Sequence, residues 1–425
     1  MKKVKNRGAF VLLIALFCAL GLALYCARYV LHGREWASFS GGGTTMGLLY
    51  DRNDILLADA GAKTYSDDYT TRVANFHVTG DYIGNVGTGA LTRLTGELAG
   101  FDLINGTYHP QVHKAHLTVD ANLNNEAYAA LAGRKGSVQI VNYKTGELLC
   151  MVSSPSMDPN TPDNIPDGAY LNRAISAAYV PGSVFKLVTL AAALETIDDI
   201  YDRTFYCGGS VMVGADQLNC TGVHGNQTIE QALANSCNCA FSELAQTLGS
   251  DVLLAYAKKL GITESHAIDG IYTTAGSIDP YEKGNINLSW SAIGQSTDLV
   301  CPNTMLRLVS AIGNGGTLVE PTMVGHGRSQ KTTKLLDADT AEKMASMMNY
   351  NVQYAYGAGS FPGLNVCAKT GTAEVGDGTD HAWFVGFLDD EAHPYAFVVQ
   401  VERGGGGLSV AGAIANRVLQ KAVAN

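Results

Sequence analysis

The amino terminus constrains the chain most, because four basic side chains in the first seven residues precede a stretch without any charge. The uncharged stretch covers residues 8–27, and at 1.5 Å per residue a helix over it roughly matches the ~30 Å hydrocarbon core of a bilayer. A cleaved signal peptide begins in the same way, but its apolar region is shorter and ends in a small-x-small site. We therefore expect an uncleaved transmembrane helix over residues 8–30. Its basic flank, residues 1–7, should stay in the cytoplasm and the remainder should be exported.

The charge balance excludes one class of partner. The chain has 425 residues, with 39 Asp or Glu against 29 Lys or Arg, for a net charge of −10. A nucleic-acid surface needs a basic face to meet the phosphates. We therefore expect no nucleic acid as a partner.

Nine cysteines are spread along the chain without the spacing of a disulfide framework. The sequence contains neither Cys-x-x-Cys nor His-Glu-x-x-His, so it predicts no metal site and no cofactor. Cys207 and Cys220 flank a glycine-rich stretch and are expected either to form a disulfide, if their compartment is oxidising, or to remain free thiols. Cys237 and Cys239 stand two apart, which is no metal signature by itself.

Strand-like and helical patterns divide the rest of the chain into two parts. Residues 31–134 mix short strand-like runs with glycine turns, which indicates a small β-rich domain. In residues 135–425, strand candidates at both ends enclose a helix-rich middle, which predicts an α+β domain whose first and last strands share one sheet. The expected strands cover residues 137–141, 147–152, 364–370, 382–388 and 395–401, and a closing helix is expected over residues 409–423.

The first of three segments with candidate catalytic residues has a serine and a lysine at the start of an apolar helix. Ser183 and Lys186 stand three apart, so both side chains share one helix face, and residues 187–194 are apolar nearly all round. The positive end of the helix dipole would favour an alkoxide on Ser183. Burial at the start of this helix would lower the pKa of Lys186 toward that of a usable base. The Ser-x-x-Lys pattern is short, and its meaning depends on the segments that follow it.

The second segment is Ser236-Cys237-Asn238. It follows a short helix that opens with a capping-box pattern at residues 228–231, and a second helical pattern comes after it. The tripeptide is therefore expected on a connection between two helices, where a hydroxyl and an amide can point into a cleft.

The third segment, Lys369-Thr370-Gly371-Thr372, is expected at the end of an apolar strand. Its glycine lets a ligand backbone lie close to the strand, and a lysine beside two threonine hydroxyls suits a carboxylate. Lys144-Thr145-Gly146 is a second copy of the tripeptide, in the predicted hairpin turn between the first two strands. Only the copy at residue 369 follows the other two segments, so the copy at residue 144 is interpreted as structural.

Taken together, the three segments resemble the active-site signature of penicillin-binding proteins and serine β-lactamases. Residues 134–141, 145–155, 292–295 and 382–387 also resemble the transpeptidase domain of penicillin-binding proteins. The region before that domain holds about 100 residues, too few for the glycosyltransferase domain of a class A protein. The chain is therefore similar to a class B penicillin-binding protein, a monofunctional peptidoglycan D,D-transpeptidase.

This resemblance implies a fold. Residues 135–425 would form a penicillin-binding/serine β-lactamase-like transpeptidase domain, an α+β fold with an antiparallel sheet and helices on both sides. A membrane anchor and a small β-rich pedestal domain over residues 31–134 would precede it. The protein would be a single-pass protein of the cell membrane with its catalytic domain on the extracytoplasmic side.

The resemblance also implies a serine acyl-enzyme mechanism. Lys186 would take the proton of Ser183, whose oxygen attacks the carbonyl between the two terminal D-alanines of a stem peptide. Ser236 would relay a proton to the departing D-alanine, and Asn238 would hydrogen-bond the amide of the donor peptide. Lys369, Thr370, Gly371 and Thr372 would hold the terminal carboxylate, and the backbone N–H groups of Ser183 and Thr372 would form the oxyanion hole.

The implied partners are peptidoglycan stem peptides ending in D-Ala-D-Ala, β-lactam antibiotics, the membrane and a SEDS-family glycan polymerase. Two alternatives stay open at this point. A serine β-lactamase or penicillin-sensing protein on the same fold would share all three motifs. A non-catalytic scaffold that binds a cell-wall polymerase would have no need of Ser183, Lys186, Ser236 and Lys369.

Overall fold

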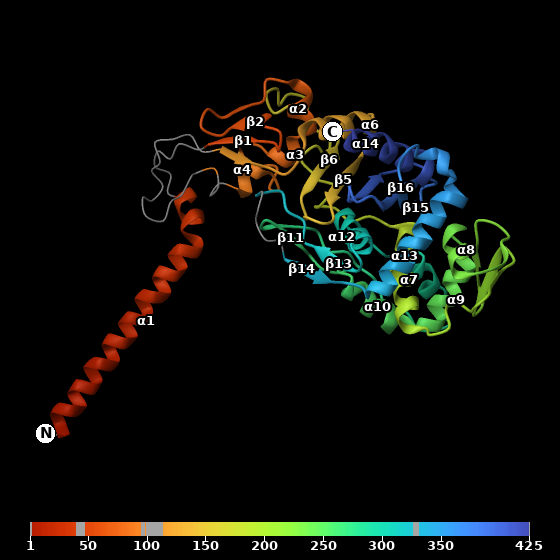
Figure 1. Cartoon of the computed structure of the whole chain (residues 1–425), viewed down its shortest axis with the longest axis horizontal. Helices are drawn as coiled ribbons and strands as arrows, with labels where there is room; N and C mark the ends of the chain where they lie inside the picture. Colours follow the sequence, from red (N-terminus) through yellow and green to blue (C-terminus); the bar gives the residue numbers. More distant parts are fainter. Residues whose placement is uncertain (1, 40–46, 95–97, 99–113, 326–330, 425) are drawn as a thin grey trace.

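The computed structural model describes residues 2–39, 47–94, 98, 114–325 and 331–424. Helix α1 (Lys2–Phe39) comes first and stands apart from the folded body (Figure 1). Its segment Arg7–Val30 is the one helical stretch of the described residues that is long and apolar enough to cross a membrane. A helix thus covers the expected residues 8–30 and continues beyond both ends, and its crossing of a membrane stays a prediction.

A five-stranded antiparallel sheet forms the centre of the larger part of the body. Strand β17 pairs with β5 from Tyr395 opposite Asn142 to Val401 opposite Gly136. The first and last strands of this part therefore share one sheet, as the sequence predicts. In spatial order, the strands are β15 (Val366–Glu374), β16 (Asp380–Leu388), β17 (Tyr395–Val401), β5 (Gly136–Asn142) and β6 (Leu148–Ser154).

Helices and short hairpins surround this sheet. The helices are α6 (Ala121–Leu131), α7 (Lys186–Thr196), α8 (Ile229–Ala234), α9 (Asn238–Leu248), α10 (Ser250–Lys259), α11 (Ile286–Ala292), α12 (Pro302–Gly313), α13 (Ala338–Tyr350) and α14 (Ala413–Val423). The paired short strands are β7 (Phe205–Cys207) with β10 (Gly225–Gln227), β8 (Ser210–Val213) with β9 (Asp216–Asn219), β11 (Ala267–Ile268) with β12 (Ile271–Tyr272), and β13 (Thr317–Val319) with β14 (Thr332–Lys334).

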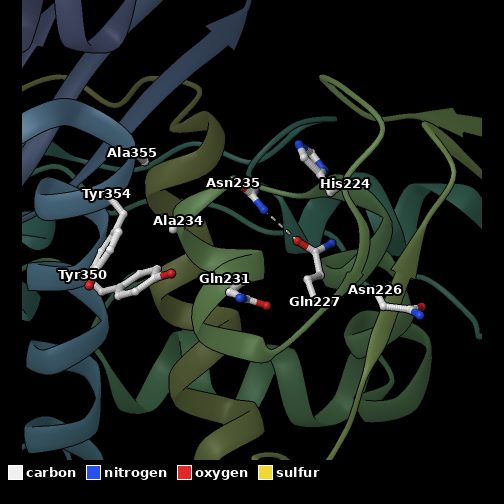
Figure 2. A pocket seen from close by; sticks show the side chains of 9 residues that line it. All are labelled: His224, Asn226, Gln227, Gln231, Ala234, Asn235, Tyr350, Tyr354 and Ala355. Atoms are coloured by element: carbon white, nitrogen blue, oxygen red, sulfur yellow. Dashed lines mark hydrogen bonds between the residues drawn. The ribbon is translucent and has the colours of Figure 1, made fainter.

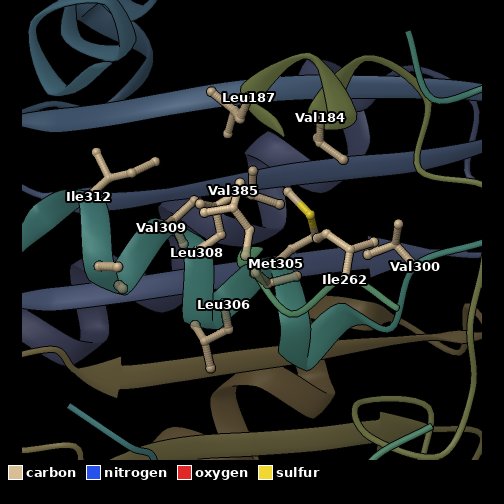
Figure 3. Packing of buried hydrophobic residues seen from close by; sticks show 14 of the residues in the cluster. Val184, Leu187, Ile262, Val300, Met305, Leu306, Leu308, Val309, Ile312 and Val385 are labelled. Carbon is tan, nitrogen blue, oxygen red and sulfur yellow. The ribbon is translucent and has the colours of Figure 1, made fainter. Parts of the chain in front are cut away.

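Both faces of the sheet are covered, because successive side chains of a strand point to opposite sides. On one face, Phe384 stacks against Phe361 and joins a buried cluster with side chains of α6 and α14. On the other face, Val385 belongs to a second cluster, in which Leu308 and Val309 of α12 pack against it (Figure 3). The expected antiparallel sheet with helices on both sides is confirmed.

Helix α7 runs through the middle of the second cluster. Every residue from Lys186 to Ala193 is buried. Val184, two residues before α7, and Leu187, in its first turn, lie toward α12 (Figure 3). The apolar pattern after Ser183 thus predicts this burial correctly, and the same burial removes the Lys186 amine from solvent.

A second, smaller sheet lies in the part of the chain before α6. Its strands run in the order β3 (Thr64–Tyr65), β2 (Leu56–Asp59), β1 (Leu48–Tyr50) and β4 (Lys114–His116), with α2 (Tyr69–Ala74), α3 (Phe76–Thr79) and α4 (Ala90–Arg93) between β3 and β4. The Asp51 carboxylate accepts the N–H of Ile55 at 2.7 Å in the β1–β2 turn and the N–H of Ala121 at 2.9 Å. One side chain thus fastens the small sheet to the start of α6.

The expected pedestal over residues 31–134 stays a prediction. Residues 40–46, 95–97 and 99–113 lie outside the described residues. Helix α6, before the expected boundary at residue 134, packs with β6 and α14 of the larger part.

One expected strand end is wrong. Strand β15 continues past residue 370 to Glu374, because its residues keep pairing with β16 until Glu374 lies opposite Asp380. Lys369 therefore lies in the middle of a strand rather than at its end. The expected closing helix is also divided: a π-helical segment, η4 (Gly407–Gly412), precedes α14.

Candidate active site

Close backbone packing fixes the segment that carries Ser183. Ser183 is half-buried in the 3-10 helix η1 (Gly182–Phe185), directly before α7. The N–H of Gly182 donates to the carbonyl of Gly294 at 2.8 Å. Gly182 has a φ of +56°, and a Cβ there would lie 2.6 Å from the carbonyl oxygen of Thr372. Glycine permits both the backbone angle and the close approach, so η1 lies directly against the strand of the third motif.

Lys186 reaches from the start of α7 to the second motif. Its Nζ donates to the carbonyl oxygen of Ser236 at 2.6 Å and to Oδ1 of Asn238 at 2.8 Å, and it lies 3.1 Å from Oγ of Ser236. Burial lowers the pKa of Lys186 to about 7. A neutral amine has two N–H donors and one lone pair, and the two carbonyl oxygens can take both donors. The lone pair is then left to accept a hydroxyl proton.

The second motif lies on the connection between α8 and α9, as predicted. The capping box is formed: Thr228 accepts the backbone N–H of Gln231, and the Gln231 side chain accepts the N–H of Thr228. Ser236 has a φ of +50°, a backbone conformation that is costly for a residue with a Cβ. The Asn238 amide is fixed at both ends, because its Nδ2 donates to the carbonyl of Asn219 at 3.0 Å.

Lys369 approaches Ser236 from the opposite side. Its Nζ lies 3.1 Å from Oγ of Ser236 and donates to the carbonyl of Thr370 at 3.0 Å. The pKa of Lys369 is well below its usual value, first because the side chain is fully buried and second because Lys186 is close. Two lysines thus share one serine hydroxyl, which links the three motifs in one site.

The threonines of the third motif contact Tyr356, which the sequence did not identify, and Gly407. The backbone N–H and Oγ1 of Thr370 both donate to the hydroxyl of Tyr356, at 3.0 and 3.2 Å. Oγ1 of Thr372 accepts the N–H of Gly407 at 3.3 Å. Nothing in the sequence distinguishes Tyr356, in the π-helical segment η2 (Asn351–Gly357), from its neighbours Tyr350 and Tyr354.

A polar pocket lies between α8 and the segment from Tyr350 to Ala355 (Figure 2). It lies beside Ala234 and Asn235, which precede Ser236, and beside Tyr354, which precedes Tyr356 by two residues. Within it, Nδ2 of Asn235 donates to Oε1 of Gln227 at 3.1 Å (Figure 2). The lining of this pocket includes no residue of the three motifs.

The second copy of the tripeptide lies where the sequence predicts it, in the turn between β5 and β6. Gly146 has a φ of +78°, and Nζ of Lys144 donates to Oδ1 of Asn314 at 2.8 Å. Its role in the structure is that of a hairpin turn.

The two copies provide a matched pair of variants. We expect Lys369→Ala to lower the rate of covalent labelling by a fluorescent penicillin by about 100-fold or more, because the family resemblance assigns Lys369 to holding the ligand carboxylate. Lys144→Ala should leave this rate within about twofold, because exposed polar contacts contribute little. Both rates are measured on the full chain in detergent, with circular dichroism as a check of folding. A loss of labelling in a folded Lys144→Ala chain would mean that the wrong copy is assigned to the site.

Four cysteines gather directly behind the second motif. Cys207, Cys220, Cys237 and Cys239 place their sulfur atoms within 4.8 Å of one another. All four are free thiols in the structure. From the sequence alone, Cys207 and Cys220 are interpreted separately from Cys237 and Cys239, because the two pairs lie in separate elements.

Comparison with known proteins identifies the family. Residues 136–420, more than half of the chain, match the model of the penicillin-binding protein transpeptidase domain. The chain therefore belongs to the penicillin-binding proteins, as a class B member.

Curated relatives agree with this assignment. The chain is 30% identical over 318 residues to the peptidoglycan D,D-transpeptidase PbpA of Mycobacterium tuberculosis, covering 65% of this chain and 64% of PbpA. It is 32% identical over 299 residues to the stage V sporulation protein D of Bacillus subtilis, covering 65% of this chain and 46% of that protein. The chain thus spans less than two thirds of the length of these relatives.

Solved structures show the same fold. A ceftriaxone acyl-enzyme of penicillin-binding protein A from Mycobacterium tuberculosis has a TM-score of 0.78 at 24% identity, covering 89% of this chain and 98% of that chain. The D,D-transpeptidase domain of a peptidoglycan glycosyltransferase from Eggerthella lenta has a TM-score of 0.76 at 26% identity, with the same two coverages.

Proposed function

We propose that this protein is a peptidoglycan D,D-transpeptidase that cross-links stem peptides through an acyl-enzyme on Ser183 and binds penicillins covalently at the same residue. The observation that carries the proposal is the convergence of Lys186 and Lys369 on the hydroxyl of Ser236, beside the segment of Ser183. The names of the relatives, peptidoglycan D,D-transpeptidases, and the β-lactam acyl-enzyme of a protein with the same fold support it.

The acylation step follows from the donors and acceptors in the site. Neutral Lys186 takes the proton of Ser183, and the serine oxygen forms a bond to the carbonyl carbon between the two terminal D-alanines. The bond to the departing amine breaks, and a proton relayed through Ser236 leaves with D-alanine. The backbone N–H groups of Ser183 and Thr372 stabilise the oxyanion.

Recognition of the donor peptide depends on its charge. Lys369, Thr370 and Thr372 hold the terminal carboxylate, and the approach of this anion raises the lowered pKa of Lys369 so that it becomes charged. Asn238 contributes its amide to the donor peptide from a position fixed by Lys186 and Asn219. An amine of a neighbouring strand then takes the acyl group from Ser183, and the cross-link forms.

We place the catalytic part outside the cytoplasm, where peptidoglycan is assembled. The segment Arg7–Val30 serves as a membrane anchor, and the basic residues before it favour a cytoplasmic amino terminus. A SEDS-family glycan polymerase is the proposed protein partner, held beside the chain in the membrane.

A serine β-lactamase or penicillin sensor is the second candidate, since it would use the same three motifs. The test is a donor peptide ending in D-Ala-D-Ala, offered to the full chain in detergent with an acceptor amine. A transpeptidase releases D-alanine and forms the peptide-amine product, and it keeps a penicillin adduct for hours. Rapid clearance of the adduct with many turnovers of antibiotic, and no peptide-amine product, would assign the chain to the β-lactamases.

A further inference from the structure

The four cysteines behind the second motif come from three separate pieces of the chain. Cys207 ends β7, Cys220 directly follows β9, and Cys237 and Cys239 lie at the N-cap and in the first turn of α9. In the part of the chain that the structure describes, no other group of three or more His, Cys, Asp or Glu side chains is arranged to hold a metal ion. The fold thus gathers four sulfur ligands that the sequence spacing does not suggest.

The distances suit one central ion. A zinc ion with four thiolates at about 2.3 Å has sulfur atoms about 3.8 Å apart along each edge of the tetrahedron. The sulfurs of Cys220 and Cys237 are 3.8 Å apart, and all four lie within 4.8 Å of one another. A disulfide would instead require two sulfurs at about 2.05 Å. Two disulfides would bond the sulfurs in two pairs and would not require all four to surround one point. The observed spacing therefore needs little adjustment to enclose an ion.

The surroundings favour thiolates. Cys207, Cys237 and Cys239 are buried, and Cys220 is half-buried, so the site is closed to solvent on most sides. The backbone N–H of Asn238 donates to Sγ of Cys220 at 3.2 Å. The amino terminus of the 11-residue helix α9 places its positive end at Cys237 and Cys239. Such N–H donors around the sulfurs are the outer contacts that hold metal ligands in place.

We propose that Cys207, Cys220, Cys237 and Cys239 form a structural Zn²⁺ site. The thiols release their protons as the ion binds, and with four protein ligands no coordination position remains open for catalysis. The ion would join β7, the chain after β9 and the start of α9, in addition to the hydrogen bond from Nδ2 of Asn238 to the carbonyl of Asn219 and the shared burial of Phe205 and Leu218. This inference goes beyond the transpeptidase activity and does not depend on it.

The site has a consequence for the second motif, because Cys237 is its middle residue. A ligand bond at Cys237 fixes the peptide units on either side, which belong to Ser236 and Asn238. The unfavourable φ of +50° at Ser236 needs support from its surroundings, and the ligand bond would add to the hydrogen bond from the N–H of Cys237 to the carbonyl of Ala232 at 2.9 Å. The four cysteines are thus positioning residues, which keep Ser236 within reach of Lys186 and Lys369.

The first test measures the metal rather than the activity. The full chain, purified in detergent without chelators, should contain one zinc per chain by plasma mass spectrometry. Cys207→Ser/Cys220→Ser should lose the zinc, whereas the matched double variant Cys301→Ser/Cys367→Ser, with two buried cysteines outside the cluster, should retain it. Zinc-free wild-type chain should take up Co²⁺ with the absorption bands of a tetrahedral tetrathiolate, a readout that does not depend on whether a variant folds.

Three results would overturn the proposal: wild-type chain without zinc that shows no tetrathiolate bands on Co²⁺ addition, iron in place of zinc, or mass spectra showing the four cysteines in two disulfides. The positioning role is tested by the acylation rate with a fluorescent penicillin. Zinc removal should slow acylation at least tenfold, and added Zn²⁺ should restore it. An unchanged rate would refute the positioning role.

Because the metal content is measured separately from the activity, failure of the transpeptidase proposal would leave the zinc result unaffected.

Discussion

Ser183→Ala is expected to abolish covalent labelling by a fluorescent penicillin and release of D-alanine from a donor peptide. The reason is that this oxygen forms the acyl bond, and alanine has no replacement for it. Labelling is followed on denaturing gels after incubation of the full chain in detergent. The matched control is Ser346→Ala, which removes a hydroxyl from the exposed face of α13 and should label like the wild type. Persistent labelling of a folded Ser183→Ala chain would remove Ser183 from its assigned role.

Lys186→Met is expected to lower the acylation rate by about 10²–10⁴-fold, the usual contribution of a general base. Methionine retains much of the side-chain volume in the buried first turn of α7, so the fold should survive and penicillin should still bind reversibly. The rate constant of acylation is measured by stopped-flow fluorescence over a range of penicillin concentrations. A reduction below tenfold in a folded chain would indicate that another group takes the proton of Ser183.

The same lysine sets the pH dependence of the wild-type chain. Because the pKa of Lys186 is lowered to about 7, the amine is neutral above this pH and protonated below it. Only the neutral amine can accept a proton, so the acylation rate should be constant above pH 8 and fall tenfold per pH unit below about 6. A rate that stays flat down to pH 5 would contradict the assignment of Lys186 as the base.

Much of the site could be predicted from local patterns. The apolar run after Ser183 predicts a buried helix and therefore a desolvated Lys186, and the capping box before Ser236 predicts the turn between two helices. Both patterns depend on residues close in sequence, and both are found in the structure. Strands β16 and β17 are likewise found at or near their expected limits, because their apolar runs are continuous.

Features that depend on contacts between distant segments could not be predicted. The pattern of Gly371 and its flanking threonines suggested the end of a strand, but pairing with β16 carries β15 on to Glu374. Tyr356 reaches Thr370 through tertiary packing, for which the sequence has no signal. Cys207 and Cys220 raised the question of a disulfide, but the structure brings Cys237 and Cys239 to the same place, and the four together suggest a metal site.

The central claim is that a substrate or penicillin acylates Ser183. The most direct test is to treat the full chain with penicillin, digest it and locate the added mass by tandem mass spectrometry. The account predicts one penicilloyl group, on the peptide that contains Ser183. An adduct on Ser236, on a lysine or on one of the cysteines would contradict it.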